Sequence, residues 1–264
     1  MRAGLNALLA ALDTVPSPVY FFLRDDDAGW DDASLFALLD CTERAGVPID
    51  LAVIPQASNA ALARELCARI DAAPGRVNVH QHGYAHCNHE PVGRKCEFGG
   101  ARSVDAQRGD LLAGRDRLRG LFGARLDAIF TPPWNRCSAA TPALLAELGY
   151  SALSRDRTAP EQHALAELPV DVDWSKQLRA TARQGEDGGD RIGLELAQRL
   201  GTGHPVGLML HHAGMDARDL ALLDALLGAL ARHPRARWVS MSEISSVRQP
   251  TAANSVKYQQ RQIS

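Results

Sequence analysis

Short apolar runs alternate with longer segments of helical periodicity along most of the chain. Apolar runs bounded by turn residues predict buried strands, and apolar residues three and four positions apart predict helices. Strands are predicted at 19–24, 49–55, 76–80, 126–133, 150–154, within 164–174, and at 205–212 and 236–241. An amphipathic helix is predicted before Pro16, and further helices at 32–43, 59–73, 104–122, 141–148, 190–200 and 217–233.

This repeated order of strand and helix favours parallel strands joined by right-handed crossovers. Seven or eight such units across residues 1–246 fit one closed or nearly closed β/α barrel, and a doubly wound, flavodoxin-like sheet stays open as an alternative. The chain has no glycine-rich phosphate loop of either common type, so nucleotide binding is not supported. Residues 247–264 lose all periodicity and are predicted to form a loosely ordered tail.

Composition is that of an ordinary globular protein, with 45% hydrophobic and 23% charged residues and a formal net charge of -2. This charge gives no electrostatic reason to expect a nucleic-acid partner, and no segment reaches the ~20 apolar residues that span a bilayer. The apolar N-terminal run is short and interrupted, unlike a signal peptide, and the five cysteines show no paired spacing. We therefore predict a cytoplasmic protein with reduced thiols, without stable membrane insertion; the pattern does not indicate an oligomeric state.

Polar residues gather where the predicted strands end. The first strand ends in RDDD (24–27), the third runs into HQHGYAH (80–86), and the fourth ends in TPPWNR (131–136). The segment LPVDVDW (168–174) and the pair His211 and His212 follow later strands. Because the carboxyl ends of parallel strands meet on one face of a barrel, where active sites are built, we expect these side chains to converge.

His82 and His86 have a spacing that suits metal binding. If their segment is helical, residues four apart share a face, and two imidazoles can reach one ion. An aspartate from 25–27 is the natural third ligand. Such a set suits Zn²⁺, and also Co²⁺, Ni²⁺ or Fe²⁺. A solvated pair without metal stays open, and His80 and His89 are interpreted as bystanders.

The segments RDDD, HGYAH, TPPWNR, DVDW and LMLHH, in this order, resemble the five motifs of the NodB-homology polysaccharide deacetylases, carbohydrate esterase family four. The resemblance spans residues 20–212, and its second motif is nearly exact, with Gly83 in the position that the family gives to serine or threonine. It implies a deformed, TIM-barrel-like (β/α)7 barrel and metal-dependent hydrolysis of an N-acetyl group.

By this resemblance Asp26 is the catalytic base and Asp27 the metal ligand, with Asp25 and Asp26 in these roles as the less favoured register. The resemblance makes His82 and His86 the other ligands. Further implied roles are general acid for His211, supporting acid for Asp173, and substrate contacts for Trp134, Trp174, Pro133 and His212.

Two positions depart from the family pattern. Thr131 stands where the third motif has an arginine that orients the base, so Arg24 or Arg136 is expected to substitute, and Arg24 is favoured. His212 replaces the aspartate that usually follows the catalytic histidine. Residues 95–100, KCEFGG, are predicted to be a mobile loop beside the site that could act as a lid.

The function favoured by the sequence is metal-dependent deacetylation of a carbohydrate or sugar precursor. In the cytoplasm the substrate would be a nucleotide- or lipid-linked sugar. Two alternatives stay open: a metal-dependent amidohydrolase or deformylase of a small molecule, and a non-catalytic barrel that binds metal or sugar. Retention of both Asp26 and His211 favours catalysis over binding alone.

Overall fold

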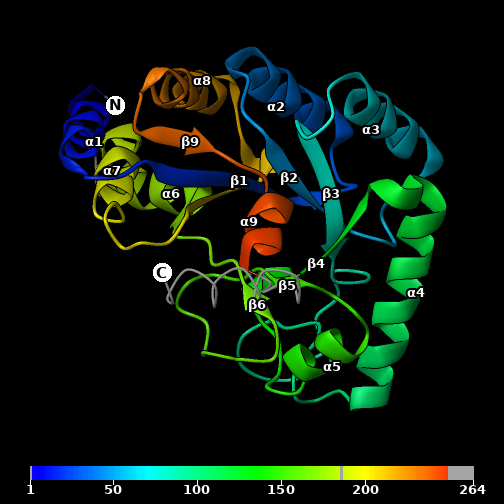
Figure 1. The fold of residues 1–264 in the computed structure, drawn as a ribbon. Coiled ribbons are helices and arrows are strands. Elements are labelled where there is room, and N and C mark those ends of the chain that lie inside the picture. Colours follow the sequence, from blue (N-terminus) through cyan, green and yellow to red (C-terminus); the bar gives the residue numbers. More distant parts are fainter. Residues whose placement is uncertain (1, 185–186, 249–264) are drawn as a thin grey trace, which may run out of the picture.

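One curled parallel sheet forms the centre of the molecule, and helices cover its outer surface (Figure 1). The structure is a computed structural model that describes residues 2–184 and 187–248. Within them the strand order is β6-β5-β4-β3-β2-β1-β8-β7, and β9 pairs with the start of β1. The strands are β1 Val19–Ala28, β2 Ile49–Val53, β3 Val77–His82, β4 Leu126–Thr131, β5 Ala152–Leu153, β6 Ala166–Glu167, β7 Val172–Asp173, β8 Val206–Leu210 and β9 Ala236–Trp238.

The helices are α1 Arg2–Thr14, α2 Asp32–Ala45, α3 Ala60–Ala72, α4 Val104–Phe122, α5 Thr141–Glu147, α6 Trp174–Gln184, α7 Gly188–Ala197, α8 Ala217–Arg232 and α9 Met241–Arg248. Each of the seven helices that the sequence predicts is present, and α6 and α9 are present in addition. The amphipathic N-terminal helix is confirmed, because α1 buries Leu8 and Leu12 in the main core. Helix α9 runs to Arg248, so the predicted tail begins two residues too early; its remainder, 249–264, lies outside the described residues.

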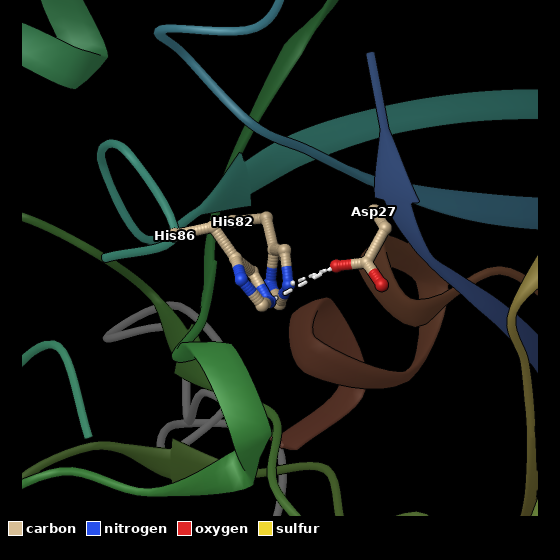
Figure 2. A group of neighbouring side chains, drawn as sticks. All are labelled: Asp27, His82 and His86. Atoms are coloured by element: carbon tan, nitrogen blue, oxygen red, sulfur yellow. Dashed lines mark hydrogen bonds and ion pairs between the residues drawn. The ribbon is translucent and has the colours of Figure 1, made fainter. Parts of the chain in front are cut away.

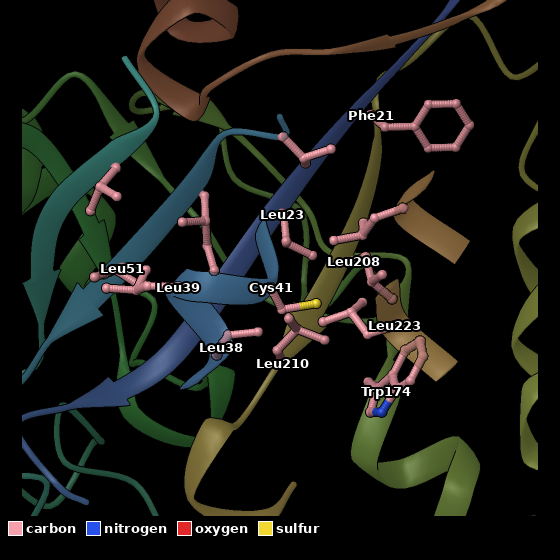
Figure 3. Close-up of a cluster of buried hydrophobic side chains, with 14 of the residues drawn as sticks. Phe21, Leu23, Leu38, Leu39, Cys41, Leu51, Trp174, Leu208, Leu210 and Leu223 are labelled. Carbon is pink, nitrogen blue, oxygen red and sulfur yellow. The ribbon is translucent and has the colours of Figure 1, made fainter. Parts of the chain in front are cut away.

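The principal hydrophobic core lies between the sheet and the helices outside it. Figure 3 shows Leu23, Leu208 and Leu210 from the central strands packed with α2 side chains and Trp174. Only 1% of Trp174 is exposed, so the expectation that this residue forms a wall of a substrate pocket is wrong. Its indole fills the core where α6 begins, because a large apolar side chain gains more from complete burial than from partial exposure.

The carboxyl ends of β1, β3, β4 and β8 meet at one end of the sheet, and this brings the polar motifs together. Strand β1 continues past the predicted boundary and includes all three aspartates, Asp25–Asp27. In register, Asp25 lies opposite Leu210 of β8, and His82 of β3 lies opposite Thr131 of β4. No helix in the described part of the chain is long and apolar enough to cross a membrane.

Candidate metal centre and active site

Asp27, His82 and His86 form the one group of potential metal ligands found in residues 2–184 and 187–248. Oδ1 of Asp27 lies 3.1 Å from Nε2 of His82 and 3.1 Å from Nε2 of His86, and the ligand atoms all lie within 4.8 Å of one another. Figure 2 shows both imidazoles directed at the carboxylate from across the sheet end. A site with two imidazoles and one carboxylate leaves further coordination positions open, as catalytic metal sites do.

The orientation of the His82 ring is set by the backbone of β4. Its Nδ1–H donates to the carbonyl oxygen of Thr131 at 3.0 Å, so Nε2 is the nitrogen that faces Asp27. A ligating histidine is commonly fixed in this way through its other nitrogen. The Thr131 hydroxyl shares a 2.8 Å hydrogen bond with Nε2 of buried His80. Burial, together with the positive charge of Arg24, lowers the pKa of His80 to about 3, so this ring is neutral.

His86 reaches the site from an irregular loop rather than from the helix that its spacing suggested. The backbone of His86 is left-handed, with φ 55°, as is that of Gly83, with φ 56°. Both histidines still face Asp27 because the chain turns back after β3. The helical interpretation of the H-x3-H spacing is therefore wrong, although the convergence it predicted is present.

Buried Glu97 binds the backbone of the loop after β3 that carries His86. This role was not predicted from the sequence. Its carboxylate accepts backbone N–H groups from Tyr84 at 3.0 Å, Ala85 at 2.7 Å and Cys87 at 3.3 Å. Glu97 is completely buried, and the backbone of its neighbour Phe98 forms a β-bridge to the β4–α5 segment. The segment 95–100 is thus packed structure, and the prediction of a mobile lid there is wrong.

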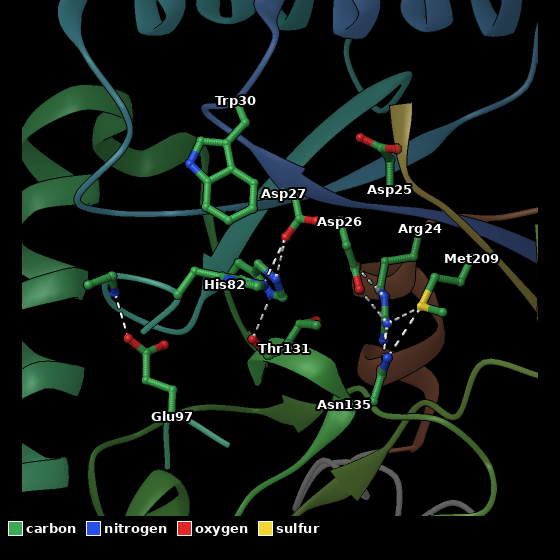
Figure 4. A network of polar contacts seen from close by, with 12 residues as sticks. Arg24, Asp25, Asp26, Asp27, Trp30, His82, Glu97, Thr131, Asn135 and Met209 are labelled. Atoms are coloured by element: carbon green, nitrogen blue, oxygen red, sulfur yellow. Dashed lines mark hydrogen bonds and ion pairs between the residues drawn. The ribbon is translucent and has the colours of Figure 1, made fainter. Parts of the chain in front are cut away.

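Asp26 and Arg24 form a buried ion pair with two contacts (Figure 4). Nε of Arg24 lies 2.8 Å from Oδ1 of Asp26, and Nη2 donates to Oδ2 at 2.9 Å. The guanidinium also donates to the Ser154 hydroxyl at 2.7 Å and to Oδ1 of Asn135 at 2.6 Å. Burial works to raise the pKa of Asp26, but the charges of Arg24, His82 and His211 together outweigh it, so that pKa lies below its ordinary value. The geometry brings Arg24, rather than Arg136, to the aspartate.

Asp25 faces the opposite way and binds His212. Nδ1–H of His212 donates to Oδ2 of Asp25 at 2.6 Å, and Nε2–H donates to the carbonyl oxygen of Trp30 at 2.6 Å. Burial alone would lower the pKa of His212, but Asp25 raises it to about 9, so the ring is a cation. The alternative register, with Asp25 as the base, does not fit. The substrate contact expected for His212 is corrected too, because its ring is buried and both of its nitrogens are occupied.

His211 and its neighbour His212 have different surroundings. A positive charge on His211 is one of the causes that lower the pKa of Asp26. Nδ1 of His211 is buried and has no hydrogen-bond partner among the described residues. Asp173 accepts the backbone N–H of Lys176 at 2.9 Å and so caps the start of α6. Between Asp173 and His211 the described residues show no hydrogen bond.

Two indoles flank His86, one of the three candidate metal ligands. The Trp134 ring centroid lies 4.5 Å from that of His86, and the Trp30 centroid lies 4.8 Å from it, edge-on. Trp30 is 42% exposed and was not singled out from the sequence, although its position three residues after Asp27 was the available signal. Pro133 is buried against Gly83, so its expected contact with substrate is corrected to a packing contact.

No family model matches the sequence, and a search of curated proteins finds no match. Solved structures do match. A family 4 acetyl xylan esterase from Clostridium thermocellum, in complex with a cobalt ion, is 15% identical over 86% of this chain and 91% of its own, with a TM-score of 0.57.

A mutant of the peptidoglycan deacetylase PdaC from Bacillus subtilis is 14% identical over 94% of this chain and 98% of its own, with a TM-score of 0.58. A family 4 pseudoenzyme from Bacillus anthracis is 15% identical over 87% of this chain and 66% of its own, with a TM-score of 0.57. At these identities the likeness is one of fold: the chain has the deformed barrel of carbohydrate esterase family 4, as its motifs predicted. Since a pseudoenzyme shares this fold, the fold alone does not establish that this chain is catalytically active.

Proposed function

We propose that the protein is a metal-dependent hydrolase that removes an N-acetyl group from a carbohydrate or sugar precursor. The observation that carries this proposal is the position of the Asp27, His82 and His86 group beside the Arg24–Asp26 ion pair. A metal-binding module needs three ligands, but it has no use for a buried, ionised carboxylate that is not a ligand. Both structural neighbours described as an esterase or a deacetylase act on acylated polysaccharides, which is consistent with a carbohydrate substrate.

The residues present fit a divalent cation. Burial works to raise the pKa of Asp27, but the hydrogen bonds from His82 and His86 outweigh it and hold that pKa well below its usual range. Asp27 is therefore an anion that faces two imidazole nitrogens, and we propose Zn²⁺ first, with Co²⁺, Ni²⁺ or Fe²⁺ as chemical equivalents. A bound cation supplies Lewis acidity, which polarises an acyl carbonyl and lowers the pKa of water from 15.7 toward about 7.

The remaining groups divide the proton transfers. Asp26 accepts a proton from the attacking water. Before this transfer, Arg24 keeps the Asp26 carboxylate ionised and oriented. His211 donates a proton to the departing nitrogen, so that the amine leaves in neutral form. Trp30 and Trp134 offer apolar walls on which a sugar ring can stack. Asp173 supports the site indirectly, because it caps the start of α6 and is not hydrogen-bonded to His211 among the described residues.

We also propose that the protein works in the cytoplasm. The five cysteines are all free thiols in the structure, which supports a reducing compartment. The substrate would then be a sugar precursor inside the cell rather than an assembled wall polymer.

The test combines metal analysis of the purified protein with an acetate-release assay on N-acetylated sugars. Asp26→Asn should keep its metal and lose roughly 10²- to 10⁴-fold in kcat, the usual contribution of a positioned base. His82→Ala should lose metal and activity together. His89→Ala, which alters an exposed histidine of the same segment, is the matched control and should keep both.

Other products would identify other functions. Release of formate or ammonia without acetate would favour a deformylase or another small-molecule amidohydrolase. Stable metal binding without any product would identify a non-catalytic barrel. Full turnover by Asp26→Asn would show that Asp26 is not the base.

A further inference from the structure

A cavity of about 680 Å³ opens beside the Arg24–Asp26 pair, and apart from Trp134 and Asp173 its lining residues have no role in the chemistry described above. Trp134, Asn135 and Met209 form its inner end, next to Arg24. From there it extends between the segment that holds Glu90–Gly100 and the loop after β5. A molecule whose acyl group is held at the metal site would therefore have space for a second group in this cavity.

Three cations line this cavity without an ion-pair partner. In residues 2–184 and 187–248, Arg94, Arg136 and Lys176 form no salt bridge. Arg136 donates instead to the carbonyl oxygen of Lys95 at 3.0 Å. Burial and the neighbouring positive charge of Arg94 lower the pKa of Arg136, and the charge of Asp156 opposes this without reversing it. Like charges held together at a cavity wall are stabilised by an anion between them.

The acidic residues of the cavity do not neutralise these cations by direct contact. Glu90, Asp156 and Asp173 each accept backbone N–H groups. A fourth cation in the lining, Arg155, is paired with Glu167 at 2.6 Å. The cavity therefore contains one arginine with an ion-pair partner and three cations without a salt bridge among the described residues, and Arg136 has further N–H donors besides the one bound to Lys95.

We infer that this cavity binds a phosphate ester carried by the acylated sugar, with Arg94 and Arg136 as its principal donors. The inference rests on the proposed function, because it places the phosphate on the substrate of the same site. A guanidinium group presents two parallel N–H donors that match phosphate oxygens, and charge-assisted bonds of this kind are about twice as strong as neutral ones. Neighbouring Lys176 adds positive charge without a fixed geometry.

The first experiment measures binding alone. Inorganic phosphate and pyrophosphate are titrated calorimetrically into the protein, before and after treatment with a chelator. The expected Kd rises by roughly 10- to 100-fold in Arg136→Gln, the size of one or two charge-assisted hydrogen bonds. The control Arg64→Gln removes an exposed arginine on α3 that forms no salt bridge within the described part of the chain, and it should bind as the wild type does. Equal affinity in Arg136→Gln, or binding that the chelator abolishes, would overturn the inference.

The second experiment compares N-acetylglucosamine 1-phosphate with its uncharged methyl glycoside. The wild type should show a higher kcat/KM for the phosphate, by roughly 10-fold or more, and Arg94→Gln with Arg136→Gln should bring the ratio close to one. A uridine diphosphate sugar distinguishes a nucleotide-linked from a simple phosphate substrate. A ratio of one in the wild type would overturn the inference while leaving deacetylation intact. Acetate release from none of them would count against the proposed function, whereas the phosphate titration would still test the cavity.

Discussion

Loss of the Arg24–Asp26 ion pair should lower the stability of the protein as well as its activity. Arg24→Met removes the guanidinium and leaves a completely buried carboxylate without its partner. Breaking a buried pair from one side typically costs about 3–5 kcal/mol, a large share of the 5–15 kcal/mol by which a domain is stable. We expect the free energy of unfolding of Arg24→Met to fall by about that amount near pH 7.

The pH dependence of this deficit follows from the sign of the pKa shift. The folded pKa of Asp26 lies below the ordinary value of 3.8, so the pair stabilises the protein above that pH and this contribution is lost in acid. In Arg24→Met the remaining effect of burial raises the pKa of Asp26, and the carboxyl takes up a proton as the pH falls. The deficit relative to wild type should therefore be largest near pH 7 and shrink toward pH 4.

A double-mutant cycle isolates the pair. Arg24→Met combined with Asp26→Asn removes both charges and should be at least about 1 kcal/mol more stable than the sum of the two single changes predicts. Recovery will be incomplete, because Ser154 and Asn135 also lose the donor that Arg24 supplies. Guanidinium denaturation followed by circular dichroism measures all four proteins, with Arg64→Met as the exposed control. A deficit in Arg24→Met below about 0.5 kcal/mol, or a deficit that does not change with pH, would refute the reasoning.

Three further changes test other contacts. Glu97→Gln weakens the hold on the His86 loop, so metal affinity should fall roughly 10- to 100-fold in a competition titration with a coloured chelator. Trp30→Ala should raise KM about 3- to 10-fold with little change in kcat, the loss of about 1 kcal/mol of stacking, and an unchanged KM would exclude contact with substrate. Burial raises the pKa of Asp50, so Asp50→Asn should gain stability over wild type by up to about 1.4 kcal/mol per pH unit as the pH rises above 4, measured by thermal unfolding.

The fold could be predicted where local pattern and burial agree. Strands β2 and β8 and the first half of β1 are largely apolar and buried, and α4 begins and ends where its periodicity does. Helix α6 was missed because its sequence, WSKQLRATARQ, is largely polar. Helix α9 was missed for a different reason: its first backbone N–H is bound by buried Asp50 of β2, a contact between residues 191 positions apart that no local window contains.

The convergence of the three candidate metal ligands was predictable from the sequence, and the residues that hold them in place were less so. Asp27, His82 and His86 converge because parallel strands end at one edge, which the strand order alone implied. His212 binds Asp25 and the carbonyl oxygen of Trp30, whereas Nδ1 of His211 has no hydrogen-bond partner among the described residues, and two adjacent histidines in a sequence do not reveal this difference. Glu97 was missed because a carboxylate that binds backbone N–H groups leaves no pattern of its own.

Gly83 has a consequence for any attempt to engineer this chain. Its φ of 56° disfavours residues with a side chain, and a Cβ built there would lie 2.6 Å from the Pro133 ring and collide with the Glu97 carboxylate. Rewriting this motif toward the consensus of the deacetylases it resembles, with Gly83→Ser, would thus disturb the turn that carries His86. Glycine at position 83 is therefore a steric requirement of this particular chain, and the consensus substitution would damage the turn that it was meant to improve.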